Sequence, residues 1–192
     1  MAEPRGFRHD VVELAARWYV FLFLNVYGVG KIAGGQFFRR GELPADVAGT
    51  LLGQAGAFEL AWTFMGYSFA YILFIGLAEV VGAWLLLWSP TKLLGVAILL
   101  PIMANILVFD AIFLDAYGAL ASATIYTLLL LVILACNRRA VGEAFRALTA
   151  APEAVPRSLA RTLRMAIAAL ALMGLLFAVD QGLVNLFGHG RG

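Results

Sequence analysis

Cysteine, histidine and charge are scarce in this chain, and each scarcity excludes a class of function. Cys136 is the only cysteine among 192 residues, so neither an intramolecular disulfide nor CxxC thiol chemistry can operate within the chain. The two histidines, His9 and His189, lie near opposite termini, whereas bis-histidine haem ligation inside a bundle needs two histidines at membrane depth. The net charge of +2 is too small to indicate a nucleic-acid partner. We therefore expect no intrinsic cofactor or metal centre and no nucleic-acid binding.

Apolar sequence, in contrast, is abundant. Hydrophobic residues make up 62% of the chain and charged residues only 14%, and the charges gather between long apolar runs. Two of these runs, residues 69–88 and 93–113, are separated only by residues 89–92. Each has the roughly 20 residues that cross a hydrocarbon layer about 30 Å thick. We interpret the pair as a transmembrane helical hairpin.

The same reasoning extends to the whole chain and predicts an all-α, polytopic membrane protein. Spans are expected at about residues 12–32, 68–88, 93–113, 118–136 and 163–187. These form a four-helix transmembrane bundle plus a fifth C-terminal span, in a single membrane domain over residues 1–192. An amphipathic segment along the outer surface is expected at about residues 44–62, because Pro44 is placed to start a helix. Residues 137–161, which contain five arginines, are interpreted as a basic inner loop.

Basic residues also predict the orientation of the chain. If the N-terminus lies inside, ten Lys and Arg residues fall on the inner side and four on the outer side. This asymmetry favours a multi-pass protein of the cell (inner) membrane, with its N-terminus in the cytoplasm and its C-terminus outside.

Several polar residues lie within or at the ends of the spans, and we take them as candidate pocket residues: Asn25, Lys31, Glu79, Asn105, Asp110 and Asp180. Ionisable groups inside spans usually face the bundle and pair, because exposure to lipid costs several kcal/mol. At 100° per residue, small residues such as Gly76 and Gly82 lie within about 60° of Glu79, which indicates a tightly packed neighbouring helix. The simplest arrangement is a polar pocket that opens outward, with Lys31 as its cation and Glu79, Asp110 or Asp180 as its anions.

Each candidate also has a purely structural explanation. Lys31 can extend its ammonium group to the lipid headgroups. Asp110 and Asp180 are close enough to span ends to be partly hydrated. Glu79 lies too deep for hydration, and its structural alternative is a hydrogen bond between helices or a neutral, protonated acid. The two asparagines can simply join helices.

Short motifs around Lys31 and Glu79 carry a family resemblance. The chain reads Asn-Val-Tyr-Gly-Val-Gly-Lys over residues 25–31, Gly-Leu-Ala-Glu-Val-Val-Gly over residues 76–82, and Thr-Lys-Leu-Leu-Gly over residues 91–95. Over about residues 14–136 it resembles the DoxX/DoxD-like family of small, usually four-helix membrane proteins. Lys31 and Glu79 match the pattern of that family, whereas the two candidate aspartates and the fifth span do not. The resemblance implies an association with thiosulfate:quinone oxidoreductase subunits or with oxidative-stress assemblies.

Three functions stay open at this point, and so does the question whether the protein is an enzyme. The first is a redox-associated subunit with a pocket for a quinone or a lipid, in which Lys31 supplies a hydrogen-bond donor and Glu79 a proton carrier. It needs a redox partner subunit, because the sequence offers no visible electron carrier. The second is a non-enzymatic assembly or chaperone partner in the lipid bilayer, and an oligomer is compatible with it. The third is a small proton-coupled transporter, against which the lack of an internal repeat argues.

Overall fold

The computed structural model describes residues 7–114, 117–150 and 158–187. Within these ranges the regular elements are α-helices and one 3₁₀ turn. Five of the helices are long and apolar enough to cross a membrane. They are α1 (Phe7–Ala33), α4 (Phe69–Leu87), α5 (Lys92–Phe113), α6 (Tyr117–Cys136) and α8 (Leu159–Phe187). The expected all-α, multi-pass fold class is confirmed.

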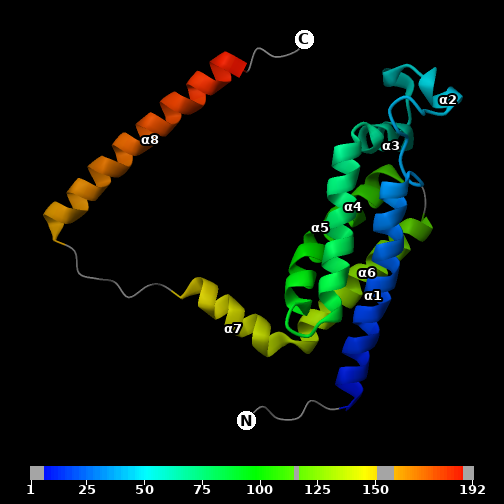
Figure 1. Ribbon diagram of the computed structural model, residues 1–192, viewed down its shortest axis with the longest axis horizontal. Helices are drawn as coiled ribbons and strands as arrows, with labels where there is room; N and C mark the ends of the chain where they lie inside the picture. Colours follow the sequence, from blue (N-terminus) through cyan, green and yellow to red (C-terminus); the bar gives the residue numbers. More distant parts are fainter. Residues whose placement is uncertain (1–6, 115–116, 151–157, 188–192) are drawn as a thin grey trace. The chain divides into compact units, whose positions relative to one another are not determined.

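The chain divides into two compact units, Met1–Ala147 and Leu148–Gly192. In the first unit, α1 packs against α4 and α6, and α5 packs against the same two helices, so the four form a closed bundle (Figure 1). The second unit contains α8, a single long apolar helix. A single membrane domain over the whole chain stays a prediction.

The bundle has an apolar interior and an apolar exterior. Its core includes Val20, Leu24, Leu86, Leu99 and Leu130, all of which are almost completely buried. Large apolar side chains also cover the outside of the four helices, where they are exposed. In a membrane protein such side chains face lipid acyl chains, so this exterior is the surface expected of a bundle that sits in a bilayer.

Glycines let α4 approach its neighbours closely. A Cβ atom added to Gly95 of α5 would lie only 2.8 Å from the carbonyl oxygen of Gly82 on α4. Small residues at helix interfaces bring backbones together in membrane bundles, where packing drives association. The short turn between α4 and α5 therefore connects two helices that are in close backbone contact.

The connection between α1 and α4 differs from the amphipathic segment expected over residues 44–62. It consists of a short helix α2 (Ala45–Ala48), the 3₁₀ turn η1 (Leu52–Gln54) and α3 (Ala57–Gly66). Three glycines interrupt it, at positions 49, 53 and 56, and glycine disfavours a continuous helix. The last piece, α3, contacts α4 and α5, so it covers one end of the bundle.

The expected basic loop at residues 137–161 also needs correction. Residues Arg138–Thr149 form the helix α7. Val141, Phe145 and Leu148 recur at helical spacing on the side opposite Arg139 and Arg146, and this pattern is typical of an amphipathic helix. Residues 151–157 of the expected loop lie outside the described residues.

Candidate functional site

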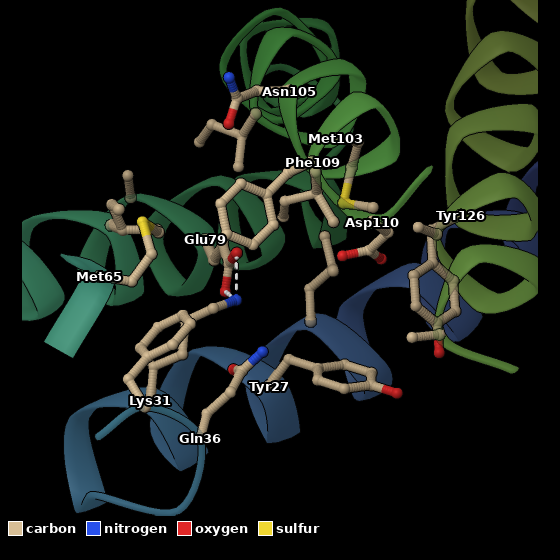
Figure 2. Close-up of a pocket in the computed structure, with 18 of the residues that line it drawn as sticks. Tyr27, Lys31, Gln36, Met65, Glu79, Met103, Asn105, Phe109, Asp110 and Tyr126 are labelled. Carbon is tan, nitrogen blue, oxygen red and sulfur yellow. Dashed lines mark hydrogen bonds and ion pairs between the residues drawn. The ribbon is translucent and has the colours of Figure 1, made fainter. Parts of the chain in front are cut away.

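A buried ion pair joins α1 to α4. The Nζ atom of Lys31 donates hydrogen bonds to both carboxylate oxygens of Glu79, at 2.6 and 2.7 Å (Figure 2). Lys31 is 6% exposed and Glu79 is completely buried. Because a lone buried charge is costly, each side chain compensates the charge of the other.

Two glycines bring these side chains together. Gly28 lies one helical turn before Lys31, and Gly76 lies one turn before Glu79, so each glycine shares a helix face with its charged partner. A Cβ atom added to Gly28 would lie 2.9 Å from the carbonyl oxygen of Gly76. The backbones of α1 and α4 are therefore in contact at these glycines, and the ion pair lies one helical turn further along each helix.

A second buried carboxylate belongs to Asp110 in the last turn of α5. Its side chain is 8% exposed and interacts electrostatically with Lys31. Among the described residues, no side chain or backbone group forms a hydrogen bond or ion pair with this carboxylate. In the view of Figure 2, Asp110 lies between Tyr126 of α6 and the ion pair. The ammonium group of Lys31 thus interacts electrostatically with two carboxylates, and it is hydrogen-bonded only to that of Glu79.

These three charged groups line a cavity of about 510 Å³ in the first unit. The volume falls in the range of small-molecule sites. Most of the wall is apolar, and its aromatic members are Tyr27, Phe37, Trp62, Tyr71, Phe74, Phe109 and Tyr126. The ring of Trp62 on α3 contacts two of these, with its centroid 5.4 Å from that of Phe37 and 6.4 Å from that of Phe109.

The cavity also reaches the outer surface of the bundle. Its lining includes Phe74 of α4, which is 71% exposed, and Asn105 of α5, which is also exposed. Both lie within helices that are apolar enough to span a membrane. The cavity wall is therefore continuous with the part of the bundle surface that would face lipid.

The candidate residues from the sequence divide into three groups. Lys31, Glu79, Asn105 and Asp110 line the cavity. Asn25 does not, because its side chain donates to the carbonyl oxygen of Phe21 at 2.7 Å and accepts from the indole nitrogen of Trp84 at 3.0 Å. It joins α1 to α4 instead, so its assignment to the pocket is corrected. Asp180 lies on α8 in the second unit, and its part in the pocket stays a prediction.

Sequence reasoning missed several residues of the cavity. Tyr126, in the middle of α6, is buried, and its hydroxyl group interacts with those of Tyr27 and Ser122. A tyrosine halfway along an apolar span is a detectable signal, because a buried hydroxyl group usually has a partner. Gln36 and Trp62 also line the cavity, but Gln36 lies in the irregular chain after α1, and Trp62 lies on α3, whose position depends on that irregular chain.

A second charged cluster lies near the start of α1 and is separate from the cavity. Arg17 donates hydrogen bonds to the carbonyl oxygens of Leu86 and Leu87, in the last turn of α4. Glu13 pairs with Arg17 at 3.8 Å and with Lys92 at the start of α5. Because the last carbonyls of a helix have no partner within it, Arg17 caps α4. We assign this cluster a structural role.

The bundle and its cavity define a small multi-pass membrane protein with an aromatic, charged cavity among its helices. The uncharacterized protein YwoB of Bacillus subtilis (strain 168) is 38% identical over 136 residues, which cover 69% of this chain and 82% of that protein. The chain belongs to the same family as that protein. No family model matches the chain, so the resemblance to the DoxX/DoxD-like family stays a prediction. No solved structure matches it either.

Proposed function

We propose that the protein binds a flat, membrane-soluble ligand of the quinone class in this cavity and acts as a redox-associated membrane subunit. The observation that carries the proposal is the ammonium group of Lys31, buried at the wall of an aromatic cavity that is open toward lipid. A quinone carbonyl needs a hydrogen-bond donor, its ring needs aromatic or apolar walls, and its isoprenoid tail needs contact with the bilayer.

The residues present fit these three needs. Lys31 has three N–H donors, and two of them are directed at Glu79, so one is left for a ligand oxygen. Trp62 and Phe109 offer ring faces for stacking. Glu79 holds the ammonium group in place and keeps its charge balanced. The apolar edge of the cavity between α4 and α5 gives an alkyl tail a path into the lipid.

The same residues indicate which part of the chemistry the ligand supplies and which part the protein supplies. A bound quinone supplies two-electron, two-proton redox chemistry, while this chain orients the ring and holds proton-carrying groups beside its oxygens. The sequence has no visible electron carrier of its own, so a partner subunit delivers or removes electrons. We further propose the cell (inner) membrane as the location, with the N-terminus in the cytoplasm, because ten of the 14 basic residues then lie inside.

A proton-coupled carrier is the second candidate, and one observation favours it. Asp110 and Glu79 are two buried acids at one cavity, and acids inside spans are frequent in proton relays. The absence of an internal sequence repeat argues against this alternative.

Binding of a quinone to the purified protein tests the proposal. The protein is placed in lipid nanodiscs, and uptake of a decyl-substituted benzoquinone is measured by equilibrium dialysis against nanodiscs without protein. We expect saturable uptake of one quinone per chain, with at least about tenfold weaker binding in Lys31→Met. Lys92→Met is the matched control, because it removes a paired lysine outside the cavity. Uptake equal to that of empty nanodiscs would reject the proposal.

A further inference from the structure

We propose that Asp110 makes the cavity select the reduced, hydroxyl-bearing form of its ring ligand over the oxidised form. The inference rests on the proposed function and adds the redox state of the ligand to it. Its basis is the contrast between two carboxylates at one cavity, one whose two oxygens both accept from Lys31 and the other without a donor among the described residues.

Asp110 combines three properties that point to a ligand. Asp110 is only 8% exposed, so protein atoms cover more than nine-tenths of it. It lines the cavity, so a ligand there can reach it. An ionised carboxylate is a hydrogen-bond acceptor only, and leaving such a group buried without a donor is costly. A ligand that donates a hydrogen bond to Asp110 removes this cost.

The other polar groups of the cavity do not provide the same selection. The hydroxyl groups of Tyr27, Ser122 and Tyr126 both donate and accept, as do the amides of Gln36 and Asn105. Lys31 donates to a carbonyl oxygen or to a hydroxyl oxygen alike. Glu79 is the other carboxylate of the cavity, but it is completely buried and both of its oxygens already accept from Lys31. Asp110 is therefore the carboxylate that distinguishes a ligand with a donor from one without.

The two redox forms of a benzoquinone differ in this property. The quinone has carbonyl oxygens that only accept, so it can bond to Lys31 but leaves Asp110 without a donor. The hydroquinone has two hydroxyl groups, one of which can accept from Lys31 while the other donates to Asp110. The reduced form can thus form hydrogen bonds with both Lys31 and Asp110, whereas the oxidised form can do so only with Lys31.

Three ligands of nearly the same shape separate these contributions. They are the decyl-substituted benzoquinone, its hydroquinone and the dimethyl ether of that hydroquinone, which keeps the oxygens but has no donor. Binding to the protein in nanodiscs is measured under anaerobic conditions by equilibrium dialysis. We expect the hydroquinone to bind at least about tenfold more tightly than either of the other two ligands.

The Asp110→Asn variant tests whether the preference arises at this residue. An asparagine amide donates as well as accepts, so the ratio of hydroquinone to quinone affinity should fall toward one. Quinone binding that is retained in the variant shows that the cavity is intact, and Asp110→Ser gives a second test if Asp110→Asn does not fold. Glu13→Gln is the matched control, since Glu13 is a buried acid outside the cavity. It should keep the wild-type ratio.

Each unfavourable outcome has a separate meaning. Saturable binding of all three ligands with equal affinity would overturn the inference and leave the proposed function standing. A hydroquinone preference that persists in both Asp110 variants would also overturn it, because the preference would arise elsewhere. If no ligand binds above the level of empty nanodiscs, the proposed function and the inference both fail.

Discussion

Gly28 and Gly76 face each other so closely that a Cβ atom on either would lie 2.9 Å from the carbonyl oxygen of the other. The contact brings α1 and α4 together at one level, one turn from Lys31 and Glu79 respectively. The ion pair thus depends on two residues that have no side chain. Replacing either glycine forces the helices apart and lengthens the distance between the charges.

Alanine substitutions on α1 test this dependence. Gly28→Ala should destabilise the protein by about 1–3 kcal/mol, because overpacking a tight contact has roughly that cost. Gly30→Ala is the control on the same helix, since its added Cβ would meet no atom within 4 Å. It should be neutral, or stabilising by up to about 1 kcal/mol. Unfolding in detergent micelles measures both, and equal stabilities of the two variants would contradict the role of the contact.

Removal of Lys31 should be more harmful than removal of the whole ion pair. Lys31→Met leaves Glu79 completely buried without its hydrogen-bonded partner, and breaking a buried pair in this way costs about 3–5 kcal/mol. The double variant Lys31→Met/Glu79→Gln removes the uncompensated charge and should recover much of the loss. A double-mutant cycle in detergent gives the coupling energy. A Lys31→Met variant as stable as the wild type would mean that the pair does not balance charge in the bundle.

Arg17 should stabilise the protein through the end of α4. Arg17→Met removes its hydrogen bonds to the carbonyl oxygens of Leu86 and Leu87, and hydrogen bonds to a charged group contribute about 1.5–3 kcal/mol. Arg8→Met is a suitable control, because Arg8 is exposed on the same helix. Hydrogen exchange should show faster exchange in the last turn of α4 in Arg17→Met alone. Unchanged exchange there would exclude a capping role.

The proposed orientation can be measured with single cysteines. In a Cys136→Ala background, Gln54→Cys places a thiol in the connection before α4, and Ser89→Cys places one in the turn after it. A membrane-impermeant maleimide added to intact cells should label position 54 only, because the basic residues favour an inner location for the turn. Labelling of position 89 alone would reverse the topology.

The helices and the charged pair were predictable because each leaves a periodic signal. The hydrophobic run of α4 gives its length, and the small residues around Glu79 indicate which face packs against a neighbour. Depth then limits the partners of a buried acid to the few cations in nearby spans, and Lys31 is one of them. The prediction that Asn25 belongs to the pocket is wrong, because periodicity alone does not reveal its hydrogen bond to Trp84.

The irregular parts could not be predicted in the same way. Trp62 lines the cavity because the connection between α1 and α3 places α3 against α4 and α5, and the path of that connection depends on local backbone angles. The helix α7 has an amphipathic pattern, but its three arginines give the segment a polar composition that also fits a loop. The average composition of a segment therefore does not reveal a short helix such as α7, whereas the spacing of its apolar residues does.

Fluorescence of Trp62 reports directly on quinone binding in the cavity, because this side chain lies in the cavity wall whereas Trp18, Trp84 and Trp88 do not. Quinones quench nearby tryptophans, and random collisions in the bilayer give quenching that does not saturate. Quinone binding in the cavity should give a saturable component in the wild-type protein that disappears in Trp62→Phe and weakens at least about tenfold in Lys31→Met. Quenching that never saturates, or that is the same in wild type and Trp62→Phe, would contradict quinone binding in this cavity.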